Sequence, residues 1–578
     1  MPSEPYVYTF AAADYYVIGV YLVLMASLGF ILKKLCHNAK DYLIGGNKIP
    51  WWLAGASIFM MSFSAWTFTG AAGFAYTHGI LIILLFYFNV IAFLIGGRFL
   101  AARVRQLRLI TFGQILHERF GRLGEQFFVW IQFPNMLFGG AIWLLGLAVF
   151  VSVAFGVPMP VTILVTGGII LLYSTLGGTW AVMTSDFLQS VVLMSLTLVI
   201  AVLTLMKVGG FSGIVEQMEP GHLRIFSDQH SWMWVLAYFS QALIIFNSIL
   251  GANRYLAVRD GRCAQKASYL AAFLFLVGPV IWFIPPLAAS FVFPEIGEML
   301  PGLQHPNDGA YVLMALHVLP AGLAGLLVMV IFAATLSSMD TAINVNAGLL
   351  TMNVYKPLFR PHAGERELFI ASRVFNVCCG VAVVCGAYAL SKQDGMNLFD
   401  LMLLLSAGIG LPLAVPCLLL FIFRRTPPWT AVASVAAAGI YSYFAVRADL
   451  HLFPRVFGII AIALVVFFIG RLLWKSTATG QREKIEKFYR RMETPVDAEK
   501  EIVGSEDVRH LSLVGLLAML VGAGLLLAAA FPNPLGARIT IALTALMIFS
   551  LGFTMHWIGS LPKSGASRRD QGNEEDPP

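Results

Sequence analysis

The chain has 578 residues, of which 58% are hydrophobic and 12% are charged, and its mean hydropathy is +0.78. Soluble globular domains carry about 25% charged residues, so this composition excludes an ordinary soluble domain and predicts that most of the chain lies in lipid. The formal net charge of +7 does not indicate nucleic-acid binding, because the lysines and arginines gather in joints between apolar runs, where they act as topology signals.

Long apolar runs repeat along the whole sequence. A helix needs about 20 apolar residues to cross a bilayer, whereas the alternating strands of about ten residues that build a membrane barrel are absent. We therefore predict an all-α polytopic membrane protein with about 15 spans. The predicted spans lie near residues 14–33, 51–77, 79–103, 124–155, 158–176, 186–208, 232–258, 268–293, 321–355, 368–390, 396–423, 429–446, 456–474, 511–531 and 539–560.

Basic residues gather in alternate joints between these spans. The first apolar run has no basic segment before it, so we expect a retained anchor and not a cleaved signal. Lysine or arginine follows most odd-numbered spans, the short joint after the fifth being the exception, whereas the joint at 294–308 carries three acids and no basic residue. The positive-inside rule then predicts an outside N-terminus and a cytoplasmic C-terminus in a plasma membrane, which we expect to be a bacterial inner membrane.

The second predicted span is interrupted by polar residues. Residues 60–73 read MMSFSAWTFTGAAG, which puts four hydroxyl side chains and two glycines in the middle of an apolar run. That composition predicts a broken helix, and unwound backbone at mid-membrane is tolerated only where it lines a cavity, exposing carbonyl oxygens to a hard cation. Small residues and hydroxyls also let helices pack closely, so this cluster alone leaves packing and binding equally open.

A second polar cluster, AATLSSMDT at residues 333–341, lies in the ninth predicted span. Ser337 and Ser338 follow Ala334 by three and four residues, so both hydroxyls should lie one turn from the Ala334 carbonyl on one helix face. One carbonyl and two hydroxyls form half of an oxygen shell for a small hard cation. The alternative is that these hydroxyls bond back to their own helix.

Four segments together resemble the sodium/solute symporter family, whose members include sodium-galactose, sodium-proline and sodium-sialic acid carriers. They are DYLIGGNKIPWWLAGASIFMMSFSAWTFTGAAGFAYTHGI at 41–80, the joint from GGTW at 177–180 to SDFLQ at 185–189, Asn253-Arg254 at the end of the seventh span, and AATLSSMDTAIN at 333–344. The resemblance runs from near residue 14 to the eleventh span. It implies a leucine-transporter-like inverted-repeat bundle of ten core helices, with spans two to six and seven to eleven as the repeats.

The resemblance also implies a co-transported sodium ion where the second and ninth spans meet, so that the two polar clusters form the halves of one site. The implied ligands are the carbonyls of Met60, Phe63 and Ala334 and the hydroxyls of Ser337 and Ser338. Asp186, at the inner end of the sixth span, matches a family aspartate on the sodium exit path; an exposed interfacial acid is the alternative. For Asp340, one turn inward from Ser337, we expect pairing with a joint arginine.

Several positions depart from the family's solute sites. Galactose carriers have Asn and Gln where this chain has Ser62 and Thr67, an acid at Phe86 and a gating tyrosine at Ile244, and proline carriers have an aspartate at Ser62. Neither recognition therefore carries over, and a sugar-like solute and an organic acid both stay open. The candidate solute contacts, each of which could equally serve packing, are Ser62, Trp66, Thr67, Thr69, Phe86, Gln132, Asn135, Gln241, Asn247 and Ser248.

The chain divides into a core and its additions. We expect an N-terminal span and joint at 1–50, core repeats at 51–208 and 232–425 within 51–425, flanking spans at 426–475, a charged linker at 476–510, two further spans at 511–560, and a tail at 561–578 that is disordered by composition. The linker contains QREKIEKFYRRMETPVDAEKE, which predicts a solvated cytoplasmic helix, with a regulatory contact as the alternative.

These observations predict a sodium-coupled symporter that imports a small polar organic solute by alternating access. A channel would need a pore-lining ring or filter, and a sensor would append a soluble signalling domain, which we do not expect after residue 560. An enzyme would need a metal or a nucleophile and base, and neither HExxH nor GxSxG occurs. A proton-coupled or facilitative carrier of the same fold stays open, because Asp186 and Asp340 could take protons. We expect the lipid bilayer and the solute as partners, no nucleic acid and no obligate protein partner.

Overall fold

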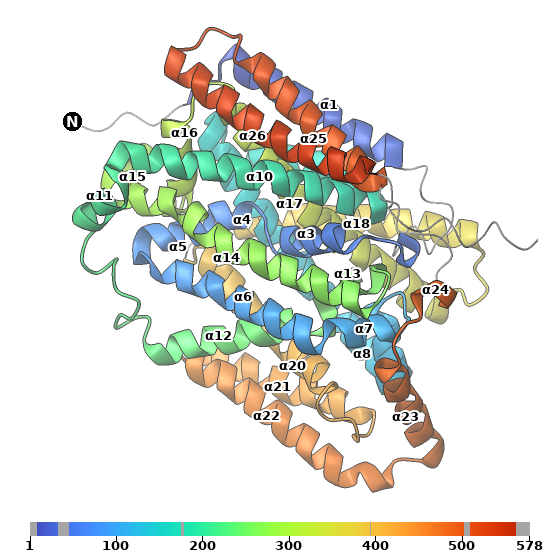
Figure 1. The fold of residues 1–578 in the computed structure, drawn as a ribbon. Helices are drawn as coiled ribbons and strands as arrows, with labels where there is room; N and C mark the ends of the chain where they lie inside the picture. The colour runs from blue at the N-terminus through green and yellow to red at the C-terminus, as the bar shows by residue number, and fades with distance from the viewer. Residues whose placement is uncertain are drawn as a thin grey trace, which may run out of the picture.

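The computed structural model describes residues 8–32, 45–174, 179–251, 253–393, 395–501 and 509–561, which form a bundle of helices (Figure 1). Eleven of these helices are long and apolar enough to cross a membrane, a bent pair adds a twelfth span, and three shorter apolar helices accompany them. Every predicted span overlaps one of these elements, while the total of fifteen stays a prediction. The joint that contains Lys33, Lys34 and Cys36, and the tail after residue 561, lie outside the described residues.

The first half of the core forms the second to sixth predicted spans. Its helices are α3 (Trp51–Met61), α4 (Ala65–Phe68), α5 (Gly70–His78), α6 (Leu81–Phe99), α7 (Ala101–Gln106), α8 (Phe112–Phe155), α9 (Met159–Ser174) and α10 (Thr179–Val208), after which comes the short α11 (Gly210–Gln217). The Thr111 hydroxyl caps α8 by accepting from the Gln114 amide, and Gly156 ends that helix in the left-handed conformation. The sixth span begins earlier than expected, since α10 starts at Thr179 and not near Asp186.

The second half of the core follows from residue 232. Its elements are α12 (Trp232–Phe246), η3 (Ile249–Gly251), α13 (Asn253–Ala257), α14 (Gly261–Val292), α15 (Ile296–Met299), η4 (Pro306–Gly309), α16 (Ala310–Val318), α17 (Leu323–Leu349), η5 (Leu350–Phe359), α18 (Glu365–Leu390), α19 (Leu398–Leu405), η6 (Ser406–Gly410) and α20 (Leu411–Leu419). Helix α17 lies at the centre, packed against α3, α8, α10 and α18. Its central position explains why most of its side chains are buried.

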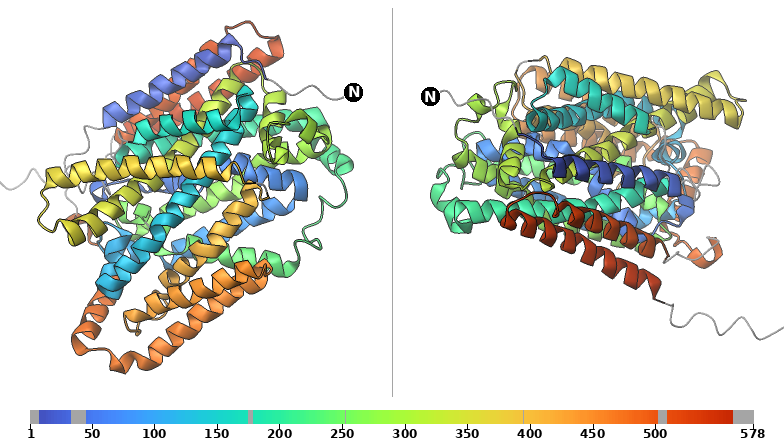
Figure 2. Two further views of the ribbon diagram at one scale, coloured as in Figure 1. Left: turned by 180° about the vertical axis from the view of Figure 1, so that it is seen from behind. Right: turned by 90° about the horizontal axis from the view of Figure 1, so that it is seen from above.

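The remaining helices flank this core on two edges (Figures 1 and 2). One edge holds α1 (Ala12–Leu32), α25 (Arg509–Ala528) and α26 (Leu535–Ser560), and the opposite edge holds α21 (Trp429–Arg447) and α22 (Leu452–Leu472). The carboxylate of Asp14 ties α1 to the core, because its Oδ1 accepts from the amides of Gly322 and Gly325 at 2.6 and 2.8 Å, where α17 begins. The shortest elements are η2 (Gly45–Asn47), η7 (Leu473–Ser476) and α24 (Ala498–Glu501).

The charged linker contains a helix, α23 (Thr479–Glu493), that is docked on the bundle. Its side chains Ile485, Phe488, Tyr489 and Met492 are buried against α7 and α8. The Tyr489 hydroxyl accepts from Arg119 Nε at 2.9 Å and donates to the Leu420 carbonyl at 2.7 Å. The expectation of a solvated helix is therefore wrong for this face, because every third or fourth residue of the charged sequence is apolar or aromatic and finds a partner on the core.

Candidate functional site

The second span is broken where its composition predicts. Helix α3 ends at Met61, α4 begins at Ala65, and the span bends by 54°. Ser64 between them is extended, and its hydroxyl caps α4 by accepting from the Trp66 amide at 3.3 Å. The Thr67 amide bonds to the Ser64 carbonyl at 3.0 Å, so it does not take the helical partner four residues earlier. The Phe63 carbonyl is thereby released from the helix.

Helix α17 meets this break with two hydroxyl side chains. Thr335 Oγ1 accepts from the Ala65 amide at 2.8 Å, which satisfies a donor that the interruption leaves without a helical partner. The Ser338 hydroxyl donates to the Phe63 carbonyl at 2.8 Å, and the Met60 and Ala334 carbonyls lie 3.4 Å from the same oxygen. The two polar clusters of the sequence therefore come together in space.

These separations suit a small hard cation. With metal–oxygen distances of about 2.4 Å, as for the similarly sized Ca²⁺, neighbouring ligands of an octahedral shell lie about 3.4 Å apart. The Met60 and Ala334 carbonyls have that spacing from Ser338 Oγ, and the Phe63 carbonyl needs to move only a few tenths of an ångström outward. All four oxygens are uncharged, so the arrangement fits a monovalent ion held weakly enough to leave.

Ser337 does not join this group of oxygens in the conformation seen here. Its hydroxyl bonds to Asp186 Oδ1, and the Ser57 hydroxyl bonds to Asp186 Oδ2 at 2.5 Å. Asp186 is fully buried inside α10, which rules out the alternative of an exposed interfacial acid. The Asp186 carboxylate therefore connects α3, α10 and α17. Its partner Ser337 is the neighbour in sequence of Ser338, whose hydroxyl contacts the carbonyls at the break.

Arg254 on α13 faces this carboxylate from the second half of the core. Its charge interacts with both Asp186 and Asp340, and its Nη2 lies 3.5 Å from the Thr341 hydroxyl. Its Nε has no hydrogen-bond partner among the described residues. Asp340 accepts from Asn344 Nδ2 at 2.8 Å and forms no ion pair among the described residues, so Arg254 acts on it through charge at a distance. A small charged network therefore lies next to the neutral oxygens.

The candidate solute residues do not form one group. Trp66 packs against α19, where its Nε1 donates to the Leu398 carbonyl at 2.9 Å and its ring stacks on Phe399. Ser62 and Thr69 bond to carbonyls of their own span, at Ile58 and Ala65, and Thr67 is buried in α4. Phe86 packs edge to face on Phe283 and Trp282 of α14, which makes it a core residue in this conformation.

Gln241 of α12 differs from the other amides among the candidate solute residues. Its Nε2 donates to the Ser406 hydroxyl of η6 at 2.7 Å, while its Oε1 has no partner among the described residues although the side chain is only 4% exposed. Asn247, by contrast, donates to the carbonyls of Ala92 and Leu243, and Ser248 to that of Ile245. Asn135 donates to Gln132 on its own helix at 3.3 Å. Gln241 is thus the candidate with an unused acceptor.

A cavity of about 310 Å³ lies at the far end of α5 from the break, and Gly73, His78, His230, Asp308 and Asp400 are among its lining residues. Asp308 Oδ2 accepts from the Leu398 amide at 3.4 Å, where α19 begins. Burial raises the pKa of Asp308 to about 7, which the Leu398 amide opposes and Asp400 reinforces. Burial lowers the pKa of His230 to about 4, and His78 adds to that effect.

Reasoning from the sequence did not assign a role to Ser57, Thr335, Arg254 or Ser406. Ser57 and Thr335 are hydroxyls in apolar runs within one turn of the proposed ligands Met60 and Ser338, which is the signal that could have included them. No local pattern relates Ser406 to Gln241, because the two residues are 165 positions apart.

Comparisons with known proteins show which family the chain belongs to. A model of the sodium:solute symporter family matches residues 42–431. The sodium/glucose cotransporter of Vibrio parahaemolyticus is 26% identical over 470 residues, which cover 75% of this chain and 84% of that protein. The sodium/sialic acid symporter NanT of Aliivibrio fischeri is 26% identical over 481 residues, which cover 80% and 93%.

Solved structures show the same fold. A substrate-bound outward-open Na⁺-coupled sialic acid symporter superposes with a TM-score of 0.69 at 21% identity, covering 81% of this chain and 99% of that one. Mhp1, a nucleobase-cation-symport-1 family transporter in a closed conformation, superposes with a TM-score of 0.53 at 17% identity, covering 78% and 99%. The expectation of a leucine-transporter-like helical bundle is thereby confirmed.

Proposed function

The chain belongs to the sodium:solute symporter family and is a sodium-coupled symporter, and we propose that its sodium ion binds at the break of the second span. The observation that carries this proposal is the group of oxygens around Ser338 Oγ, which the Met60, Phe63 and Ala334 carbonyls approach to 3.4, 2.8 and 3.4 Å. Ser337 would complete the shell by turning its hydroxyl away from Asp186 when the ion arrives.

Sodium at this position would join the broken span to α17. Because the ligands come from both elements, the ion favours the conformation in which they touch, and its departure lets them separate. Asp186 lies beside the site and not in it, so we propose that it attracts the departing cation along the inner path. This direction assumes the N-outside, C-inside orientation that the distribution of basic joints favours.

We further propose a hydroxylated, uncharged solute of sugar-like shape, imported into the cell. Gln241 Oε1 and the Ser406 hydroxyl would bind solute hydroxyls, and the stacked rings of Trp66 and Phe399 would cover them. The buried arginines Arg105, Arg119 and Arg254 bond to Val258, Tyr489 and Thr341 and not to Gln241 or Ser406, so the polar atoms proposed to bind the solute are neutral. The sodium/glucose relative supports this class, and the sodium/sialic acid relative keeps an acidic sugar as the second candidate.

The proposal is tested by uptake into proteoliposomes at one fixed pH. With an inward sodium gradient we expect accumulation of a neutral sugar, and with choline in place of sodium we expect equilibration or no uptake. Equal accumulation driven by a proton gradient without sodium would instead establish the proton-coupled alternative. Sialic acid as a competitor separates the two solute classes, because a site built of neutral groups should bind the acidic sugar weakly.

Gln241→Leu tests the solute site apart from the sodium site. Leaving a solute hydroxyl without its buried partner should reduce solute affinity about ten- to hundredfold, while the sodium concentration for half-maximal thermal stabilisation stays the same. Gln132→Leu is the matched control, since that buried amide bonds to Asn135 on its own helix. A larger loss of solute affinity in Gln132→Leu than in Gln241→Leu would move the solute site to α8.

A further inference from the structure

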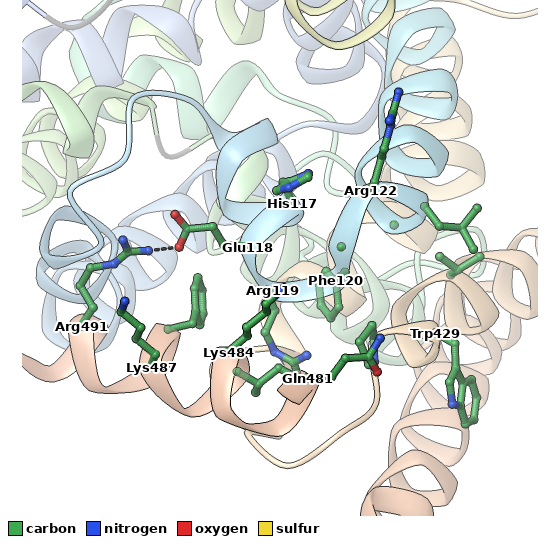
Figure 3. A pocket seen from close by; sticks show the side chains of 17 residues that line it. His117, Glu118, Arg119, Phe120, Arg122, Trp429, Gln481, Lys484, Lys487 and Arg491 are labelled. Carbon is green, nitrogen blue, oxygen red and sulfur yellow. Dashed lines mark ion pairs between the residues drawn. The ribbon is translucent and has the colours of Figure 1, made fainter. Parts of the chain in front are cut away.

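A second cavity, of about 730 Å³, opens where the linker helix α23 docks on α8 (Figure 3). Its walls come from residues 117–124 of α8, the start of α21 and one flank of α23. Among its lining residues six carry basic groups, His117, Arg119, Arg122, Lys484, Lys487 and Arg491, and one is acidic, Glu118. None of the proposed sodium and solute residues lines this cavity.

The single acid among these lining residues is already neutralised. Glu118 forms an ion pair with Arg491, drawn as a dashed line in Figure 3. Arg122 donates to the Pro357 carbonyl at 3.1 Å, which leaves its charge uncompensated. Lys484 and Lys487 form no ion pair with any described residue. The cavity therefore presents a net positive surface that water and salt alone would have to balance.

Arg119 gives the cavity an unused buried donor. The side chain is 1% exposed, with its Nε bonded to the Tyr489 hydroxyl at 2.9 Å and its Nη2 to the Thr426 hydroxyl at 2.6 Å. Its Nη1 has no hydrogen-bond partner among the described residues. A buried guanidinium donor without a partner is costly, and an anion in the cavity would supply one.

The backbone adds a helix start to the same wall. Gly121, at φ 73°, interrupts α8, so the helix begins again at Arg122, and residues 121–124 line the cavity. The first amides of a helix favour negative charge. This helix start and the unused Arg119 donor point independently to an anionic ligand.

The rim of the cavity is apolar and belongs to two membrane spans. Leu123, 74% exposed, stands at the restart of α8, and Trp429, 43% exposed, begins α21. Exposed tryptophan at a span end is typical of the membrane interface. A ligand in this cavity would therefore have its charged part among the arginines and lysines and any hydrocarbon part against the outside of α8 and α21.

We propose that this cavity binds the phosphate headgroup of an anionic phospholipid from the cytoplasmic leaflet. Basic pockets between helix ends on the cytoplasmic side are where such lipids are recognised. The bound lipid would bridge α23 to α8 and α21 and so hold the linker against the bundle. The assignment to that leaflet rests on the proposed orientation of the chain.

Lipid binding to the purified full-length protein tests this. Native mass spectrometry in detergent should show phosphatidylglycerol retained at concentrations where phosphatidylcholine is lost. The double variant Lys484→Gln/Lys487→Gln, which changes two exposed lysine heads and no buried contact, should weaken phosphatidylglycerol binding roughly 25-fold, about five-fold for each charge. Arg490→Gln is the matched control, because Arg490 is on the same helix, exposed and outside the cavity. The affinity of this variant for phosphatidylglycerol should stay within about twofold of the wild-type value.

The outcomes that overturn the proposal are distinct. Equal retention of phosphatidylcholine, or an unchanged phosphatidylglycerol affinity in the double variant, would show that the cavity does not recognise the anionic headgroup. Stabilisation by inorganic phosphate that matches the effect of the lipid and is lost in the double variant would assign the site to a soluble anion. No ion gradient is used, so each result is independent of sodium-coupled uptake.

Discussion

Two spans are interrupted, each being the first span of one half of the core. The hydrogen bonds that stabilise the two breaks differ. The second span is interrupted between α3 and α4, and the seventh between α12 and α13. Each break contains serine in an otherwise apolar run. From composition alone, both could bind a ligand.

The difference lies in where the hydrogen bonds go. At the first break, the released Phe63 carbonyl takes its donor from Ser338 of α17, and three carbonyls converge on that hydroxyl. At the second break, Ser248 donates to Ile245 of its own span, and Asn247 to Leu243 and to Ala92 of α6. A Cβ at Gly96 would lie 2.5 Å from Asn247 Oδ1, so the absence of a side chain there lets α6 approach.

Polar residues in a span thus indicate a break. Whether the break can bind a ligand depends on which residues form hydrogen bonds with its free carbonyls. Where side chains of the broken span itself donate to its free carbonyl oxygens, those oxygens are already hydrogen-bonded and the break is a packed turn. Where another span supplies the hydroxyl, carbonyl oxygens from both spans lie around that hydroxyl. A cation can then bind these oxygens in place of the hydrogen bonds between them. We therefore propose that the first break binds the ion and that the second positions Arg254 against Asp186.

The largest effect is expected for Asp186→Ala, which cuts the charged link between the two breaks. It leaves the buried Arg254 with Asp340 as its remaining acidic neighbour and the Ser57 and Ser337 hydroxyls without an acceptor, so the protein should lose about 3–5 kcal/mol of stability. Thermal unfolding of the purified protein measures this. Asp186→Asn, which keeps an acceptor, should lose less; a fully stable Asp186→Ala protein would mean that the two breaks are not coupled through this charge.

The end of the first broken span that lies at the 310 Å³ cavity should respond to pH through Asp308. Its pKa is raised from 3.8 to about 7, so its contribution to stability is complete below pH 3.8 and is lost as pH rises through 7. Between pH 5 and 8 the folded state should lose at most about 2–3 kcal/mol from this group.

Comparing melting temperatures at the two pH values, in the wild type and in Asp308→Asn, isolates this contribution from those of the other titratable groups that line the cavity, which are Asp400, His78, His230 and His305. The variant should show the flatter pH dependence. An identical pH dependence in both proteins would place the titration on one of those other groups.

Much of the fold could be predicted from hydropathy, because lipid forces each span to be apolar and each backbone group to be paired within it. The broken second span was also predictable, since hydroxyls and glycines at 62–73 stand out from the apolar residues around them. The docking of α23 was not, because its buried Phe488 and Tyr489 are surrounded in sequence by charged residues, and only the core shows what they contact.

Within the site, sequence spacing located Ser338 correctly relative to Ala334 but not the direction of Ser337. Both serines lie one turn from Ala334, yet the hydroxyl of Ser337 bonds to Asp186, 151 residues away in sequence. The sequence left the burial of Asp186 open between a buried and an exposed acid for a related reason: α10 extends back to Thr179 through polar residues, which other spans cover. Neither contact leaves a local signal.

Ser338→Ala should raise the sodium concentration for half-maximal uptake about five- to tenfold, because one neutral ligand of a weak site is worth about 1 kcal/mol. Ser337→Ala should have a smaller effect, since that hydroxyl is bonded to Asp186 before any ion binds. Expression and maximal uptake at saturating sodium are the controls. Sodium dependence that stays unchanged in Ser338→Ala would remove the first break as the sodium site.

The smallest effect is expected for Ser248→Ala, the matching change at the second break. The side chain is 6% exposed, and its hydroxyl donates at 2.9 Å to the Ile245 carbonyl, three residues earlier in its own span. Such a local bond competes with helix hydrogen bonding and adds little stability. The variant should therefore lose no more than about 1 kcal/mol of stability, with a correspondingly small change in melting temperature. Sodium half-saturation should not move, because no carbonyl from another span approaches this oxygen in the described residues. A shift as large as that of Ser338→Ala would show that both breaks bind the ion, and that the serine at the second break is freed from Ile245 in another conformation of the transport cycle.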